Sequence, residues 1–203
     1  HFAGTAGHYA RSRPGYGDAA LDRLVARFDL DESSRVLDLG CGTGQLAVPL
    51  AQRAGSVVAM DPNDAMCAAT AERAAAAGEP VASRLETCVG SDADLRAGTI
   101  EAVAPLDLTT MGRSFHWMDE RPTLDRLREH TVPGGGVALV DDEEWLTAGG
   151  EPWMAAVHEV ASRYLEGLPE RTDPATVEYE DPWDELLVER GFEQIDPSRR
   201  QVA

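Results

Sequence analysis

The stretch that decides the fold is Arg35–Gly44, which reads RVLDLGCGTG. Its apolar residues form a run that is too short for a helix and that suits a buried parallel strand. The run ends in three glycines at alternate positions, Gly40, Gly42 and Gly44. Glycines just past a strand let the backbone take positive φ and let a ligand approach without a Cβ in the way. The sequence therefore predicts a strand followed by a ligand-binding turn.

Two cofactor classes use such a turn. Residues 45–53 can begin a helix whose free N–H groups point back toward the glycines, which completes a nucleotide-type pocket at the carboxyl end of a sheet. Gly42, Gly44 and Ala47 satisfy the loose dinucleotide fingerprint, so an NAD-dependent oxidoreductase stays open. Asp38 favours the second class, cofactors that carry a positive charge, because an acid at the end of a strand attracts a cationic ligand and repels a pyrophosphate.

The segment DLGCGTG (38–44) resembles motif I of the class I S-adenosylmethionine-dependent methyltransferases, of the small-molecule, type 11-like group. The resemblance extends over roughly residues 9–140. It implies an α/β, Rossmann-like fold with a mostly parallel sheet and helices on both faces, and S-adenosyl-L-methionine as the cofactor. Within the motif, the resemblance assigns cofactor binding to Asp38, Gly40, Cys41, Gly42 and Gly44.

A second cofactor segment follows the strand predicted at Ser56–Met60, which ends at Asp61. An acid about twenty residues past the glycines can accept both ribose hydroxyls of an adenosine, in either cofactor class. Asp61 could also cap the next helix, Asn63–Ala77, with Pro62 in its first turn. The resemblance adds Pro62 and Met66 to the cofactor-binding set, and Met66 is equally suited to filling the core.

Two further segments match the family. GSDADL (90–95) resembles the G-D-A-x-x-L segment in which an acidic side chain and the next backbone N–H read the adenine edge. Asp92 and Ala93 are the matching positions. Pro105–Met111 resembles the fourth strand, and Met111 at its end completes the predicted cofactor set.

The segment GRSFHWM (112–118) leaves the carboxyl end of that strand, where ligands bind in an open α/β sheet. Imidazoles exchange a proton near neutral pH, so His116 is the candidate general base for a hydroxyl or ammonium acceptor. The alternative is that His116 only shapes the pocket or forms a structural hydrogen bond. Phe115 and Trp117 are candidate substrate contacts, and core or cofactor-wall roles suit them equally.

An upstream segment, YARSRPGY (9–16), resembles the family's Y-x-x-x-R-P-x-Y stretch, which covers the cofactor or substrate. By that resemblance Tyr9, Arg13 and Tyr16 are candidate lid residues. A solvated N-terminal arm with its aromatics packed down is the alternative.

The remaining elements follow from periodicity and turn signals. Helices are predicted at Asp18–Phe28, with Asp18 as N-cap, and at Arg121–His130, Glu151–Leu165 and Asp184–Arg190. Strands are predicted at Ser83–Val89 and at Val137–Val140 after a TVPGGG turn, and a sixth begins at Phe192–Ile195. The family normally has a seventh, antiparallel strand, and we predict no segment of residues 1–203 as that strand.

Composition narrows the function. With 203 residues, 43% hydrophobic and 27% charged, the chain is expected to form one soluble globular domain over residues 1–203. No apolar run reaches the length of a membrane span, and we expect no charged-then-apolar leader before the first helix. The three cysteines lack metal-ligand spacing, so we expect a cytoplasmic protein with reduced thiols and no metal site.

The net charge of −18 argues against nucleic acid and anionic membranes, and favours a neutral or cationic small molecule. The sequence predicts methyl transfer from S-adenosylmethionine to the oxygen or nitrogen of a small-molecule acceptor. An NAD-dependent oxidoreductase and a non-catalytic, methyltransferase-like binding protein are the alternatives. The oligomeric state is left open.

Overall fold

The computed structural model describes residues 15–95, 103–141, 152–165, 167–168, 170–171 and 183–193. Within them lies one five-stranded sheet with the order β3-β2-β1-β4-β5, and every neighbouring pair is parallel. The strands are β1 Arg35–Leu39, β2 Ser56–Asp61, β3 Leu85–Val89, β4 Leu106–Gly112 and β5 Thr131–Val140. The predicted fold class, a parallel α/β sheet of Rossmann type, is confirmed.

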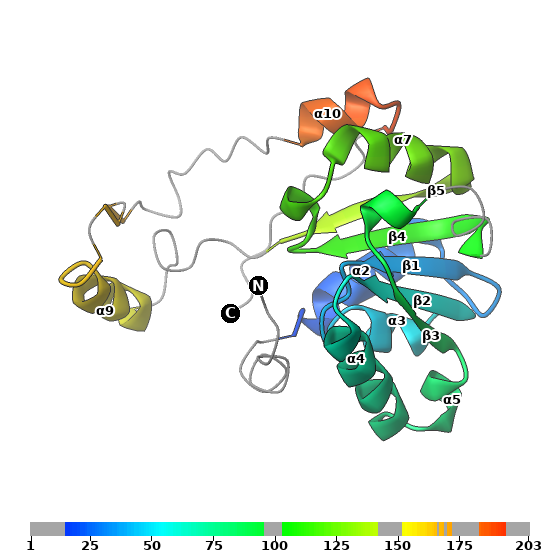
Figure 1. Cartoon of the computed structure of the whole chain (residues 1–203), viewed down its shortest axis with the longest axis horizontal. Helices are drawn as coiled ribbons and strands as arrows, with labels where there is room; N and C mark the ends of the chain where they lie inside the picture. The colour runs from blue at the N-terminus through cyan, green and yellow to red at the C-terminus, as the bar shows by residue number, and fades with distance from the viewer. Residues whose placement is uncertain are drawn as a thin grey trace.

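Helices cover both faces of this sheet (Figure 1). One face carries α2 Asp18–Phe28, α3 Ala47–Ala51, α4 Asp64–Ala76 and α5 Glu79–Ala82. The other carries α7 Glu120–His130 and α10 Asp184–Glu189. Two short 3-10 turns, η1 Asp92–Asp94 and η2 Phe115–Trp117, follow β3 and β4, and α9 Pro152–Ala161 is drawn apart from the layers.

The alternation of side chains along the strands builds a separate core on each face. In β1, Val36 packs into the cluster beneath α2 and α3, whereas Leu37 and Leu39 pack into the cluster beneath α7. The central strands are apolar on both sides because both faces are covered, as expected for a parallel sheet. This burial fixes β1 as the rigid support of the turn that follows it.

The sheet order puts the topological switch point between β1 and β4. Chain connections leave these two neighbouring strands in opposite directions, so a crevice opens at their carboxyl ends. The segments after them touch there: the Ser114 hydroxyl donates to the Leu39 carbonyl at 2.8 Å. A Cβ at Gly40, whose φ is +74°, would collide with Ser114, so only glycine allows this close approach.

Some element boundaries differ from the sequence prediction. The TVPGGG segment is part of β5 rather than a turn before it, because Thr131 already pairs with Leu106 across an irregular register. The four-residue α5 was not predicted. The N-cap of α2 is Gly17 rather than Asp18, which is the first helical residue. No helix within the described ranges is long and apolar enough to cross a membrane.

Candidate active site

The glycine turn after β1 adopts the backbone predicted for it. Gly40, Gly42 and Gly44 all have positive φ, at +74°, +55° and +78°. The turn crosses the end of β2, where the Met60 carbonyl accepts from the N–H groups of Gly40 and Cys41 at 2.8 and 2.9 Å. Among the described residues, a Cβ at Gly42 would meet only the Gln45 side-chain oxygen, at 3.9 Å, so these residues leave this side of the turn open.

The Asp38 carboxylate is enclosed beneath the turn, with 1% of the residue exposed. Its Oδ2 accepts from the N–H of Ala47 at 3.0 Å and its Oδ1 accepts from the Thr110 hydroxyl at 2.8 Å. Burial raises the pKa of this carboxyl to about 7, although both hydrogen bonds oppose the rise. We expected Asp38 to face a cationic ligand, but both oxygens point into the protein, so its effect on a ligand is electrostatic.

Asp61, at the end of β2, holds the turn from the other side. Its Oδ2 accepts from the Gly42 N–H at 3.0 Å and its Oδ1 from the Asn63 N–H at 2.9 Å. Burial raises the pKa of Asp61, against the effect of these two hydrogen bonds. Each carboxylate oxygen keeps a second lone pair for a further donor. The helix-capping role falls to Asn63, whose side chain accepts from the Ala65 N–H at 3.0 Å.

Two polar side chains of the turn are buried without a partner in the described part of the chain. They are the Thr43 hydroxyl, in a residue 1% exposed, and the Gln45 amide nitrogen, in a residue 7% exposed. Buried polar atoms are normally hydrogen-bonded, so a ligand or water at the turn would satisfy them. Sequence reasoning missed both residues. Their position between and just after the glycines was the signal available.

Cys41 supports the turn from within the core. Its hydrogen bond with Cys67, together with burial, raises the pKa of the Cys41 thiol. The neighbouring Thr70 hydroxyl donates to the Gly42 carbonyl at 3.0 Å, which ties the turn to α4. Met66 of α4 is also buried, at 5% exposed, whereas Pro62 lies exposed between β2 and α4.

The two groups predicted to read the adenine edge already have protein partners. The Asp92 carboxylate accepts from the Asp119 N–H at 3.0 Å and from the Thr123 hydroxyl at 3.4 Å, so it is directed at the first turn of α7. The Ala93 N–H donates to the Ser91 hydroxyl at 3.3 Å. Both hydrogen bonds to Asp92 are accepted by its Oδ2, and the assignment of Asp92 and Ala93 to the cofactor stays a prediction.

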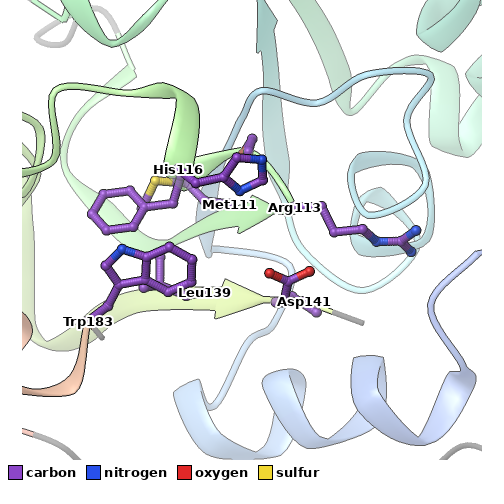
Figure 2. Close-up of a pocket in the computed structure, with 9 residues that line it drawn as sticks. Met111, Arg113, His116, Leu139, Asp141 and Trp183 are labelled. Atoms are coloured by element: carbon purple, nitrogen blue, oxygen red, sulfur yellow. The ribbon is translucent and has the colours of Figure 1, made fainter. Parts of the chain in front are cut away.

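A small pocket lies at the carboxyl ends of β4 and β5, beside the glycine turn (Figure 2). It is lined by Met111, Arg113, Ser114, Phe115, His116, Leu139, Val140, Asp141 and Trp183. Phe115 is 2% exposed and meets Trp183 edge to face, with ring centroids 5.5 Å apart. The Trp183 indole N–H donates to Glu120 at 2.8 Å, which anchors α10 to α7. Phe115, like Met111, therefore belongs to an apolar wall.

His116 and Trp117 lie at the exposed edge of this pocket. Their rings are 5.0 Å apart, and Trp117 is 76% exposed. Figure 2 shows the His116 imidazole beyond the end of β4 and Asp141 at the end of β5, and both residues line the pocket. The placement is compatible with a base and with a residue that only shapes the entrance.

Tyr16 extends the site from the start of the described chain, while Tyr9 and Arg13 lie outside the described residues. The Arg113 Nε donates to the Tyr16 hydroxyl at 3.0 Å, and the guanidinium carbon lies 4.5 Å from the centre of the Tyr16 ring. A Cβ at Gly112 would meet the same hydroxyl at 2.5 Å. Tyr16 thus lies across the end of β4, where a lid residue is expected.

The structure contains no cluster of three or more His, Cys, Asp or Glu residues able to hold a metal ion within the ranges it describes. Carboxylates, unpartnered polar atoms and an apolar wall instead surround a turn with an open face.

Comparison with known proteins agrees with this geometry. Residues 37–137 match the family described as a methyltransferase domain. An uncharacterized methyltransferase of Mycobacterium tuberculosis is 30% identical over 143 residues, which cover 68% of this chain and 51% of the relative. A trans-aconitate 2-methyltransferase of M. tuberculosis is 31% identical over 189 residues, covering 89% of this chain and 62% of the relative.

The chain therefore spans about half the length of the uncharacterized mycobacterial methyltransferases that it matches. Among solved structures, the glycopeptide N-methyltransferase MtfA in complex with sinefungin superposes with a TM-score of 0.52. The two are 23% identical in sequence, over 64% of this chain and 51% of that one. At this identity the likeness concerns the fold.

Proposed function

The chain belongs to the class I S-adenosylmethionine-dependent methyltransferase family, and from this premise we propose that it transfers the methyl group of S-adenosylmethionine to a small molecule. The observation that carries the proposal is the glycine turn braced by Asp38 and Asp61, next to a pocket that ends in His116. The proposal takes residues 1–203 as one methyltransferase domain.

The residues of the turn fit this cofactor. The side of Gly42 that lacks a Cβ is open, so the ligand can lie against the backbone. The free lone pairs of Asp61 accept the ribose hydroxyls, and the Thr43 hydroxyl and Gln45 amide offer hydrogen bonds to its polar groups. Asp38 adds a negative charge beneath the turn, which favours a cation above it.

S-adenosylmethionine supplies a methyl carbon already activated by a positively charged sulfur. The protein therefore mainly aligns donor and acceptor, and alignment alone can lower the activation barrier by several kcal/mol. The apolar wall of Phe115 and Trp183 holds the acceptor and excludes water. His116, at the edge, takes the proton that leaves an oxygen or nitrogen acceptor.

The acceptor is a small organic molecule. The similar proteins with assigned activities act on trans-aconitate or, in the solved structure, on a glycopeptide. A net charge of −18 disfavours a nucleic acid as the substrate. None of the similar proteins reported above is named as an oxidoreductase. The match to the dinucleotide fingerprint at Gly42, Gly44 and Ala47 is therefore the one observation that favours an oxidoreductase.

Calorimetry tests the cofactor first. S-adenosylmethionine and S-adenosylhomocysteine should bind the wild-type chain, and NAD should not. Asp61→Asn should weaken both ligands, whereas Asp64→Asn, at an exposed carboxylate three residues further on, should leave their affinity unchanged. Tight binding of NAD without binding of S-adenosylmethionine would establish the oxidoreductase instead.

Activity is tested by a screen of small-molecule acceptors in which release of S-adenosylhomocysteine is measured. We expect release that depends on an acceptor bearing a free hydroxyl, carboxylate or amine. His116→Ala should reduce it, with cofactor affinity unchanged. Cofactor binding without turnover on any acceptor would favour a non-catalytic binding protein of the same fold.

A further inference from the structure

We propose that Thr110 is a positioning residue, whose hydroxyl holds the Asp38 carboxylate ionised and directed at α3, so that the glycine turn is tuned for a cationic ligand. The inference rests on the proposed function and adds to it a residue in β4 that no motif pointed to. Thr110 touches neither the glycines nor the open face of the turn. It acts through Asp38.

The geometry links three elements through one side chain. Thr110 lies beside Asp38 in the β1–β4 register and is completely buried. Its hydroxyl donates to one carboxylate oxygen at 2.8 Å, while the other oxygen accepts from Ala47, the first residue of α3, at 3.0 Å. The carboxylate therefore bridges the two strands of the switch point and the helix that follows the turn.

The charges around Asp38 make the hydroxyl important. In the described part of the chain, the charged group that acts on Asp38 is Asp61, the last residue of β2, which repels it. In the turn, the nearby titratable group is the buried Cys41 thiol, on which both carboxylates act electrostatically. From α3 and β4, Asp38 receives only the Ala47 N–H and the Thr110 hydroxyl. Two neutral donors thus support a buried anion.

Burial and Asp61 raise the pKa of Asp38 to about 7, and the two donors limit the rise. Asp38 therefore changes charge close to neutral pH, and loss of one donor moves that change to higher pH. The ionised form attracts a sulfonium, whereas the protonated form does not. Methyl transfer converts the sulfonium into a neutral thioether, so the charge of Asp38 should matter more for S-adenosylmethionine than for S-adenosylhomocysteine.

The test compares Thr110→Val, which keeps the shape and removes the hydroxyl, with Thr110→Ser, which keeps the hydroxyl. Affinities for both ligands are measured by calorimetry from pH 6 to 9. In wild type, affinity for S-adenosylmethionine should fall as the pH drops through 7. In Thr110→Val this fall should move up by about one pH unit, the value of one lost hydrogen bond to a charged group. Its affinity at pH 7 should drop about fivefold, because the ionised fraction of Asp38 falls from about one half to about one tenth, and it should recover at pH 9. Thr110→Ser should follow the wild type.

The recovery at high pH separates a tuning role from a structural one. An equal loss of affinity at every pH, or an equal loss for both ligands, would overturn the proposal. Asp38→Asn supplies the second check, because adding Thr110→Val to it should produce no pH-dependent change in affinity. A pH-dependent change in that double variant would also overturn the proposal.

Unfolding of the ligand-free protein gives an independent measurement. Because a raised pKa makes stability fall as Asp38 ionises, that fall should extend to higher pH in Thr110→Val than in wild type. An unchanged profile would refute control of Asp38 by Thr110. If the wild type bound neither ligand, the proposed function would fail, while the unfolding profile would still decide the role of Thr110.

Discussion

Replacing Asp38 by asparagine should stabilise the protein at alkaline pH and remove part of its pH dependence. The amide oxygen can still accept from the Ala47 N–H, and the amide nitrogen can donate to the Thr110 hydroxyl, so the buried geometry is kept. What disappears is the need to ionise a carboxyl that is 1% exposed. Asp38→Asn therefore tests how much a buried negative charge lowers the free energy of unfolding.

The magnitude follows from the pKa. In the unfolded chain the carboxyl loses its proton near 3.8, whereas in the folded protein it does so at about 7. Between these two pH values the Asp38 carboxyl binds fewer protons in the unfolded state than in the folded state, so its contribution to the unfolding free energy falls as pH rises. Below and above this range the contribution of Asp38 is constant. At about 1.4 kcal/mol per pH unit, the gap corresponds to ~4 kcal/mol as a ceiling. Above pH 7, Asp38→Asn lacks this loss.

The assay is urea unfolding of wild type and variant at intervals from pH 4.5 to 8.5. The difference in unfolding free energy should grow in favour of Asp38→Asn up to about pH 7 and then level off. Asp64→Asn, at an exposed carboxylate, serves as the control and should run parallel to wild type. Parallel profiles for wild type and Asp38→Asn would refute the reasoning, because they would mean that burial does not oppose the ionisation of Asp38.

Three further changes test the ligand side of the site. Asp61→Ala should weaken S-adenosylhomocysteine by about 1–3 kcal/mol in calorimetry, since it leaves hydrogen-bonding groups unpaired; unchanged affinity would remove Asp61 from the ribose. Gly42→Val should abolish binding, because a branched side chain suits neither a φ of +55° nor the open face, and a variant shown by circular dichroism to be folded that binds normally would contradict the site. His116→Ala should lower kcat by roughly 10²–10⁴-fold with little change in KM, and should flatten the pH–rate profile. A raised KM with unchanged kcat would instead show that His116 only lines the pocket.

The fold could be predicted from the sequence because its decisive signals are local. The apolar run of β1 and the alternate glycines lie within ten residues of each other, and the structure reproduces both. The helix at Asp18–Phe28 was predicted with its observed bounds. The predicted start of β5 was wrong because the glycines of this segment resemble a turn. Thr131 belongs to the strand because it pairs with Leu106, which is distant in the sequence. Long-range pairing has no local signature.

The site was predictable in its residue types but not in its orientations. The sequence marks Asp38 and Asp61 as acids at strand ends, yet it cannot say which way each side chain turns. The partner of Asp38 in β4 is 72 residues away, and a hydroxyl there is one of many in the chain. Asp92 shows the same limit: the sequence shows its match to an adenine-reading segment, but not that its carboxylate accepts hydrogen bonds from Asp119 and Thr123. Such partners become visible only when the strands are aligned.

The two carboxylates that brace the turn oppose each other, and this opposition favours a positively charged ligand. Burial raises the pKa of both Asp38 and Asp61, and the charge of Asp61 raises that of Asp38 further, so ionising both carboxyls at the turn costs stability. A cation above the open side of Gly42 would reduce that repulsion, whereas a pyrophosphate would add to it. Because the same backbone geometry, and an acid in the position of Asp61, serve cofactors of either charge, the discrimination lies in Asp38 rather than in the glycines. That physical difference favours S-adenosylmethionine over NAD at this turn.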